Sequence, residues 1–140
     1  MFLANYSDQL SDLPLNPYID RFTESNAIAG FLAVRPSQSF HVVDFSDDCV
    51  ISGLHPVEET DLWINGGFLI MRQNVFDFIR PGEDLVETPF ARLVERRGLY
   101  SEKYTGFWKS MDTLKDKLSY DELYNAGVRP WELGRKTKGA

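Results

Sequence analysis

The sequence predicts a mixed α/β domain in which helices flank a mixed β-sheet. Three observations support this fold class. Short β-type runs alternate along the chain with segments of helical periodicity. Signals for helix starts and stops, such as Pro in a first turn and a following Gly, bracket the helical segments. Connections long enough for a parallel crossover occur around the first helix and between Gln73 and Gly98.

The first expected elements are a strand and a helix. Phe2–Tyr6 is apolar at nearly every position, a pattern typical of a strand buried on both faces. Asn16 and Pro17 predict a helix start, with Asn as the cap and Pro at the first helical position. The apolar stripe of this helix consists of Tyr18, Ile19 and Phe22.

From Ala27 to Ile70 the pattern favours strands. Short runs of β-type residues are separated there by Pro, Ser and Asp. Within this stretch His41–Ile51 predicts a hairpin, because an acidic turn lies between two β-type runs. The expected strands are Gly30–Val34, Phe40–Phe45, Cys49–Leu54 and Leu62–Ile70.

Two helices are expected next. A short helix around Val75–Ile79 ends at the Pro81-Gly82 pair. A second helix starts at Thr88-Pro89 and stops at Gly98.

The chain then predicts a last strand, a last helix and a tail. Leu99–Trp108 is the expected strand. Ser119–Glu122 fits a capping box for the last helix, which Gly127 ends. We therefore expect one domain over residues 1–134, followed by a flexible basic tail at 135–140.

Composition limits the possible partners. The chain has 140 residues, 43% hydrophobic and 26% charged, which is a globular balance. Its net charge of −6 argues against a nucleic-acid partner. The single cysteine, Cys49, permits no internal disulfide and fits a reducing compartment. No apolar run approaches the roughly 20 residues of a membrane span, and the first residues lack the basic region of a signal peptide, so we expect a cytoplasmic protein without a membrane partner.

General catalytic signatures are absent from the sequence. It has no Gly-x-Ser-x-Gly motif, no phosphate loop and no Cys/His cluster. His41 and His55 have no third ligand at a recognisable spacing, and a structural zinc site needs four ligands.

Longer motifs are specific when taken together. Trp63–Phe68 is Trp-Ile-Asn-Gly-Gly-Phe, and Gly106–Thr113 is Gly-Phe-Trp-Lys-Ser-Met-Asp-Thr. Tyr6–Asp12 follows the pattern Tyr-x-Asp-x-x-x-Asp, and Ala33–Pro36 and Pro130-Trp131 complete the set. In order and spacing these segments resemble the second half of the sugar-1-phosphate nucleotidyltransferases of the glucose-1-phosphate cytidylyltransferase type. The resemblance covers almost the whole chain.

The resemblance implies the C-terminal half of a nucleotidyltransferase fold, which is GT-A-like and Rossmann-like. In that family a sugar 1-phosphate oxygen attacks the α-phosphorus of a nucleoside triphosphate, and pyrophosphate leaves. By resemblance Asp8 and Asp112 would be the catalytic carboxylates and would hold Mg²⁺. His55 is a further catalytic candidate, because it stands where the family has a phosphate-binding lysine.

The resemblance also places the sugar beside Asn65, Gly66 and Gly67, where glycine lets the backbone approach closely. Trp108 is a further candidate for substrate binding. Purely structural roles remain open for all of these residues. The glycines would permit a bulge or close strand packing, Trp108 would be core, and the two aspartates would cap a turn and a helix.

Several positions depart from the family pattern. Ser7 and Gln9 replace the glycines that flank the aspartate, and Leu54-His55-Pro56 replaces Glu-Lys-Pro. Ser39–His41 replaces Arg-Phe-Gly. The 140 residues also contain neither the Gly-rich loop nor the lysine of the family's N-terminal half. Each change removes an anion contact or narrows a phosphate site, so we expect a degraded site.

Three functions are compatible with these features. The first is a half-domain that cannot transfer nucleotide alone and works with a chain that supplies the nucleotide half. The second is a repurposed enzyme of a small-molecule pathway, of sugars or natural products, that binds a small polar molecule in the old sugar pocket. The third is a non-catalytic partner of a full-length nucleotidyltransferase.

The strand Phe2–Tyr6 bears on the oligomeric state. In the parent fold it lies inside the sheet, paired on a side that these residues do not supply. An unpaired apolar edge without Pro or Lys invites pairing with another chain. We therefore expect a homo-oligomer, or a partner chain, joined through this edge.

Overall fold

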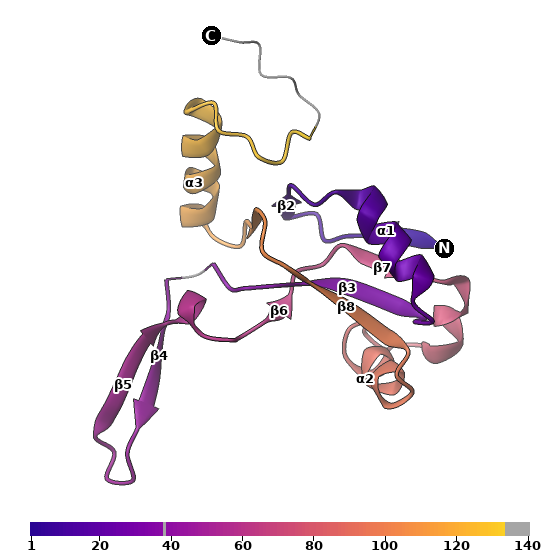
Figure 1. The fold of residues 1–140 in the computed structure, drawn as a ribbon, viewed down its shortest axis with the longest axis horizontal. Helices are drawn as coiled ribbons and strands as arrows, with labels where there is room; N and C mark the ends of the chain where they lie inside the picture. Colours follow the sequence, from indigo (N-terminus) through magenta and orange to yellow (C-terminus); the bar gives the residue numbers. More distant parts are fainter. Residues whose placement is uncertain (38, 134–140) are drawn as a thin grey trace.

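A five-stranded mixed sheet organises the chain, with helices on both of its faces (Figure 1). The structure is a computed structural model that describes residues 1–37 and 39–133, so the predicted tail at 135–140 lies outside the described residues. The expected mixed α/β class is confirmed. In chain order the elements are β1 (Phe2–Ala4), β2 (Gln9–Ser11), α1 (Leu15–Glu24), β3 (Ala29–Val34), β4 (His41–Phe45), β5 (Ile51–Pro56), the 3₁₀ turn η1 (Val57–Glu59), β6 (Ile64–Asn65), β7 (Leu69–Met71), the 3₁₀ helix η2 (Gln73–Phe78), α2 (Thr88–Glu95), β8 (Leu99–Tyr104), β9 (Trp108–Ser110) and α3 (Leu114–Asn125).

β3 is the central strand of the sheet. β8 pairs with it in parallel along its whole length. On its other side β3 pairs antiparallel with β7 near its amino end and with β6 near its carboxyl end. β1 pairs antiparallel with β7 and forms an edge of the sheet. Since β1 and β3 are both antiparallel to β7, they run in the same direction and end at the same side of the sheet.

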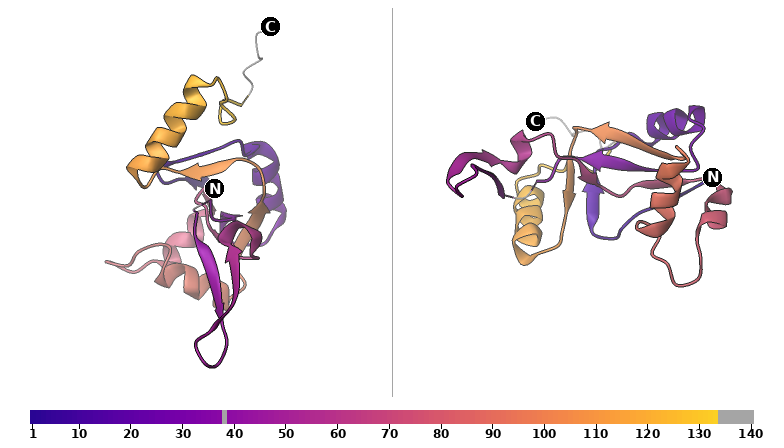
Figure 2. Two further views of the ribbon diagram at one scale, coloured as in Figure 1. Left: turned by 90° about the vertical axis from the view of Figure 1, so that its left-hand side faces the viewer. Right: turned by 90° about the horizontal axis from the view of Figure 1, so that it is seen from below.

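Each face of the sheet is covered by helical segments (Figure 2). α1 packs on one face, and η2 and α2 pack on the other. The core between α1 and the sheet consists of Leu13, Tyr18, Phe22, Ala27, Leu32, Val34 and Ile70. The core between the sheet and the two helical segments η2 and α2 consists of Ala29, Leu69, Met71, Val75, Phe90 and Leu93. The two faces of one sheet thus hold two separate cores, as expected for alternating strand side chains.

Two strand pairs lie outside the main sheet. β2 pairs antiparallel with β9, and α3 follows β9 directly. β4 and β5 form the hairpin predicted over His41–Ile51, which projects from the rest of the chain (Figure 1). Every residue of β4 is exposed. Among the described residues, no helix is long and apolar enough to cross a membrane.

Two helix starts differ from the sequence-based expectation. The N-cap of α1 is Pro14, so the predicted cap Asn16 and the proline after it lie in the first turn, where a missing N–H is harmless. The capping box of α3 is formed by Thr113 and Asp116 rather than by Ser119–Glu122. The helix extends back to Thr113 because its hydroxyl and the Asp116 carboxylate satisfy each other's backbone N–H groups.

The strand predicted over Leu62–Ile70 is interrupted. Ala33 of β3 pairs with Asn65, whereas Gly30 pairs with Ile70. Three steps along β3 therefore correspond to five along the partner strand, and the two additional residues form a bulge between β6 and β7. The last predicted strand, Leu99–Trp108, is also divided, because β8 leaves the sheet after Tyr104 and β9 turns to pair with β2.

The first strand is shorter and more exposed than predicted. Only Phe2–Ala4 is paired, and Leu3 and Tyr6 are 46% and 41% exposed. The prediction of burial on both faces was wrong for these residues, because Leu3 lies on an edge strand with neighbouring side chains on one side only and Tyr6 lies beyond the end of that strand.

Candidate functional site

Asp8 and Asp112 lie at one end of the β2–β9 ribbon. β2 begins directly after Asp8, and β9 ends two residues before Asp112. The backbone N–H of Met111 donates a hydrogen bond of 2.8 Å to the carbonyl oxygen of Asp8, which extends the ribbon by one further pair. Two carboxylates that are far apart in the sequence are thereby brought to neighbouring positions.

The two carboxylates have different surroundings. Oδ1 of Asp8 is enclosed and has no hydrogen-bond partner among the described residues. Asp112 is exposed, and its Oδ2 accepts a hydrogen bond of 2.6 Å from the hydroxyl of Ser110, which is itself buried. An enclosed carboxylate oxygen without a partner is costly, so Asp8 is suited to receive a cation.

The donor set fits Mg²⁺. That ion commonly takes one or two protein carboxylates and completes its shell with water and phosphate oxygens. Asp8 and Asp112 would supply the protein ligands. In the part of the chain that the structure describes, no three His, Cys, Asp or Glu residues are gathered as in a closed metal site.

Asn65, the last residue of β6, and Gly66 and Gly67, which follow it in the bulge before β7, form a segment that we call the glycine turn. The N–H of Gly66 donates to the carbonyl of Leu32 over 2.7 Å, and the N–H of Leu32 donates to the carbonyl of Gly67 over 2.9 Å. The side-chain oxygen of Asn65 accepts from the N–H of Gly67 over 2.9 Å. The predicted sugar-facing residues are therefore one rigid unit beside the carboxyl end of β3.

The two glycines are required for different reasons. A Cβ on Gly66 would lie 2.8 Å from both methyl groups of Val34, so this glycine permits close packing on β3. Gly67 has a φ of +71°, and a Cβ there would collide with the side-chain oxygens of Asn5 and Gln9. Gly66 is therefore required for close packing of the turn on β3. Gly67 is required because of its left-handed backbone conformation and because Asn5 and Gln9 leave no space for a side chain.

Trp108 is attached to the glycine turn. Its indole N–H donates a hydrogen bond of 2.8 Å to the carbonyl of Gly66, and its ring packs against the core under α1. The structure thus supports a positioning role for Trp108 that the sequence did not separate from a simple core role.

Three further polar residues, Asn5, Tyr6 and Gln9, lie beside this turn, and the sequence did not predict a place in the site for any of them. The side-chain oxygen of Asn5 accepts from the N–H of Phe68 over 2.7 Å. Burial raises the pKa of the Tyr6 hydroxyl, the charge of Asp84 raises it further, and a hydrogen bond with the Asn65 side chain opposes the shift. The enclosed side-chain oxygen of Gln9 has no partner among the described residues. Tyr6 and Gln9 could have been found from their positions in the motif around Asp8, and Asn5 directly precedes that motif.

A pocket of about 310 Å³ lies on the α3 side of Asp8. Its lining is mostly apolar and includes Leu10, Met111, Tyr120 and Trp131. Burial raises the pKa of Tyr120 to about 12, and the ring of Trp131 lies 5.6 Å from the Tyr120 ring. The pocket therefore has the carboxylate of Asp8 on one side and the aromatic rings of Tyr120 and Trp131 on another.

His55 is not brought to the other candidates. It lies on β5 of the projecting hairpin, where its Nε2 is 2.9 Å from a carboxylate oxygen of Asp44 on β4 (Figure 1). The hairpin register places these two side chains on one face of a two-stranded ribbon. The geometry gives His55 a cross-strand partner and separates it from Asp8 and Asp112.

Curated relatives match this chain along nearly its whole length. It is 30% identical over 132 residues to the glucose-1-phosphate cytidylyltransferases of Salmonella typhi and Salmonella typhimurium (strain LT2), which covers 94% of this chain and 51% of each relative. It is 26% identical over 134 residues to a probable glucose-1-phosphate cytidylyltransferase of Bacillus subtilis (strain 168). The chain thus spans about half the length of the curated relatives it matches, namely their C-terminal half. No protein-family model matches it.

A solved structure shares the fold. A putative glucose-1-phosphate thymidylyltransferase from Bacillus anthracis, in complex with a sucrose, superposes with a TM-score of 0.56 at 16% identity. The match covers 83% of this chain and 51% of that chain.

Proposed function

Because this chain corresponds to the C-terminal half of a sugar-1-phosphate nucleotidyltransferase of the glucose-1-phosphate cytidylyltransferase type, we propose that it forms the metal-binding and sugar-binding half of such a site. The observation that supports this proposal most directly is the pairing of Asp8 with Met111, which brings Asp112 beside Asp8. The enclosed and unpartnered oxygen of Asp8 would then be satisfied by a cation.

The proposed roles follow from the geometry. Asp8 and Asp112 would hold Mg²⁺, whose charge would neutralise the phosphates. The glycine turn would face the sugar, with the amide of Asn65 and the hydroxyl of Tyr6 as hydrogen-bonding groups. Trp108 would fix the turn through the carbonyl of Gly66.

We propose that these residues alone do not transfer nucleotide. They include no Gly-rich loop and no lysine that would compensate the triphosphate. Gln9, which stands where the family has glycine, occupies space next to Gly67. The nucleotide side would come from other residues docked along β1, which is an edge strand of the sheet and carries the exposed Leu3.

A complementation assay tests the proposal. The purified chain is incubated with CTP, Mg²⁺ and glucose 1-phosphate, with and without the N-terminal half of the Salmonella typhi enzyme, and pyrophosphate release is measured. We expect no turnover by either half alone and turnover by the mixture. Turnover by this chain alone would contradict the need for a nucleotide half. No turnover by a mixture whose halves are shown to associate would contradict a retained site.

A further inference from the structure

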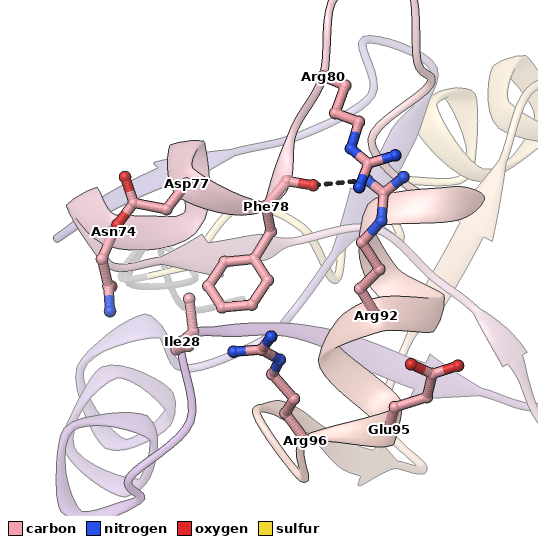
Figure 3. A pocket seen from close by; sticks show the side chains of 8 residues that line it. All are labelled: Ile28, Asn74, Asp77, Phe78, Arg80, Arg92, Glu95 and Arg96. Carbon is pink, nitrogen blue, oxygen red and sulfur yellow. Dashed lines mark hydrogen bonds between the residues drawn. The ribbon is translucent and has the colours of Figure 1, made fainter.

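A second pocket lies at the opposite end of the sheet. It has a volume of about 480 Å³ and lies between η2 and α2, beside Ile28, which directly precedes β3 (Figure 3). The glycine turn instead lies beside the carboxyl end of β3, where Val34 pairs with β6. Ligands of open α/β sheets bind outside the carboxyl ends of the strands, so this pocket is distinct from the proposed catalytic site.

Three guanidinium groups line the pocket, and one of them is already compensated. Arg92 forms two hydrogen bonds with the carboxylate of Glu83, at 2.6 and 2.5 Å. It donates a third, of 2.8 Å, to the carbonyl oxygen of Phe78, which is the dashed line in Figure 3. The charge of Glu95 acts on the same guanidinium. Glu83 also accepts the backbone N–H of Arg80 over 3.0 Å, so this ion pair fixes the loop that carries Arg80.

The other two guanidinium groups are less closely compensated, although the charge of Arg80 also acts on Glu83. Within the described ranges, neither Arg80 nor Arg96 forms an ion pair. Arg96 lies over the ring of Phe78, 5.4 Å from its centroid. Two guanidinium groups that line one pocket and whose N–H groups are not used in an ion pair among the described residues are suited to a phosphate or carboxylate, which they bind through forked hydrogen bonds.

Acidic side chains restrict which anion fits. Asp77 and Glu95 line the same pocket, and both are exposed. They would repel a polyanion such as a nucleoside triphosphate, but they would accept hydrogen bonds from hydroxyl groups. The ring of Phe78 adds an apolar surface of the kind against which a sugar ring packs. Volume, charge and polarity therefore all favour a small ligand with one anionic group and several hydroxyls.

We propose that this pocket binds a small sugar phosphate, with the phosphate held by Arg80 and Arg96 and the hydroxyls by Asp77 and Glu95. Because the lining of this pocket includes neither Asp8 nor Asp112, a ligand bound there is not the substrate of the proposed catalytic site. It bridges η2 and α2, the two helical segments that cover one face of the sheet.

Calorimetric titration of the full chain with glucose 6-phosphate, inorganic phosphate and glucose tests the proposal. We expect glucose 6-phosphate to bind most tightly, inorganic phosphate more weakly, and glucose not at all at about 10 mM. Arg80→Gln and Arg96→Gln should each weaken glucose 6-phosphate binding about tenfold or more, because each loses charge-assisted hydrogen bonds. Arg97→Gln is the matched control, since it makes the same change of charge next to the pocket without lining it.

The variant Asp112→Asn separates the two sites. It should bind glucose 6-phosphate as the wild type does if the arginine pocket is responsible. Loss of binding in Asp112→Asn, with binding retained in Arg80→Gln and Arg96→Gln, would assign the ligand to the other site and overturn the proposal. Equal affinity for inorganic phosphate and glucose 6-phosphate would overturn the role of Asp77 and Glu95. No binding of any phosphate would overturn the site itself.

Discussion

The indole N–H of Trp108 donates a hydrogen bond of 2.8 Å to the carbonyl oxygen of Gly66. Trp108→Phe removes this donor and keeps an aromatic ring in place. We expect the free energy of unfolding to fall by about 1 kcal/mol, because the carbonyl loses its partner. Urea titration measures the change. Trp63→Phe is the control, since its indole bonds the exposed Asp61, and it should cost less than about 0.5 kcal/mol. An equal decrease in the free energy of unfolding for both variants would show that the hydrogen bond to Gly66 does not contribute to stability more than the bond to Asp61.

Gly67 and Gly82 form a second matched pair. Both have positive φ, +71° and +82°, but only Gly67 is crowded by neighbouring side chains. Alanine should cost about 1–2 kcal/mol at Gly82 from backbone strain alone. At Gly67 it should cost at least about 1 kcal/mol more, because the new methyl meets Asn5 and Gln9. Chemical unfolding of both variants checks this difference. Similar costs would show that the turn relaxes freely.

The ion pair between Glu83 and Arg92 should make stability depend on pH in the acid range. The hydrogen bonds from Arg92 lower the pKa of Glu83 from 4.5 to about 2. A lowered carboxylate pKa stabilises the folded state fully above pH 4.5, and this contribution is lost as the pH falls towards about 2. Glu83→Gln should therefore show a shallower loss of stability over this range in thermal unfolding. Glu122→Gln on α3 is the control for the change of charge. A slope in Glu83→Gln as steep as in the wild type would refute the assignment.

The carboxylate pair should decide activity in the complementation assay. Asp8→Asn and Asp112→Asn should each reduce pyrophosphate release at least about a hundredfold, because a metal ligand is lost. Asp112→Asn should unfold at about the wild-type urea concentration because Asp112 is exposed, and Asp8→Asn should be no less stable than the wild type because it removes an enclosed charge without a partner. Asp121→Asn, which lines the pocket beside Asp8 but pairs with Lys117, should retain activity. Normal turnover in Asp8→Asn would exclude it as a ligand.

The exposed edge of β1 should promote association. We expect light scattering at micromolar concentration to give a mass above the 16.1 kDa of one chain. Leu3→Lys should favour the monomer, because a lysine on an edge strand opposes strand pairing. Leu114→Lys changes an even more exposed leucine on α3 and should leave the mass unchanged. A clean monomer for the unmodified chain would rule out this edge as an interface.

Local patterns predicted the elements whose signals are local. The acidic turn between two β-type runs correctly indicated the β4–β5 hairpin, and Thr88-Pro89 correctly marked the start of α2. The box at Ser119–Glu122 failed because an equally good box at Thr113 begins the same helix one turn and a half earlier. The strand at Leu62–Ile70 was predicted as continuous because periodicity does not register two inserted residues.

The sequence could predict the candidate site residues that lie in recognisable motifs, but not the contacts that depend on how distant segments pack together. The motifs around Asp8 and Asp112 selected two residues that the β2–β9 pairing brings together. The bond from Trp108 to Gly66 depends on how β9 crosses the sheet, which no short segment encodes. The position of His55 depends in the same way on the direction of a projecting hairpin.

The bulge at the glycine turn has a consequence for how this site tolerates change in length. Side chains along a strand alternate with a period of two, and the bulge adds two residues relative to β3. Because two is an even number, the alternation of side chains between the two faces of the sheet is the same in β6 and β7. The apolar side chains of both strands therefore point towards the cores. A loss or gain of one residue here would shift that phase and turn Leu69 and Met71 towards the wrong faces. Changes in steps of two would reshape the turn and leave the cores in register.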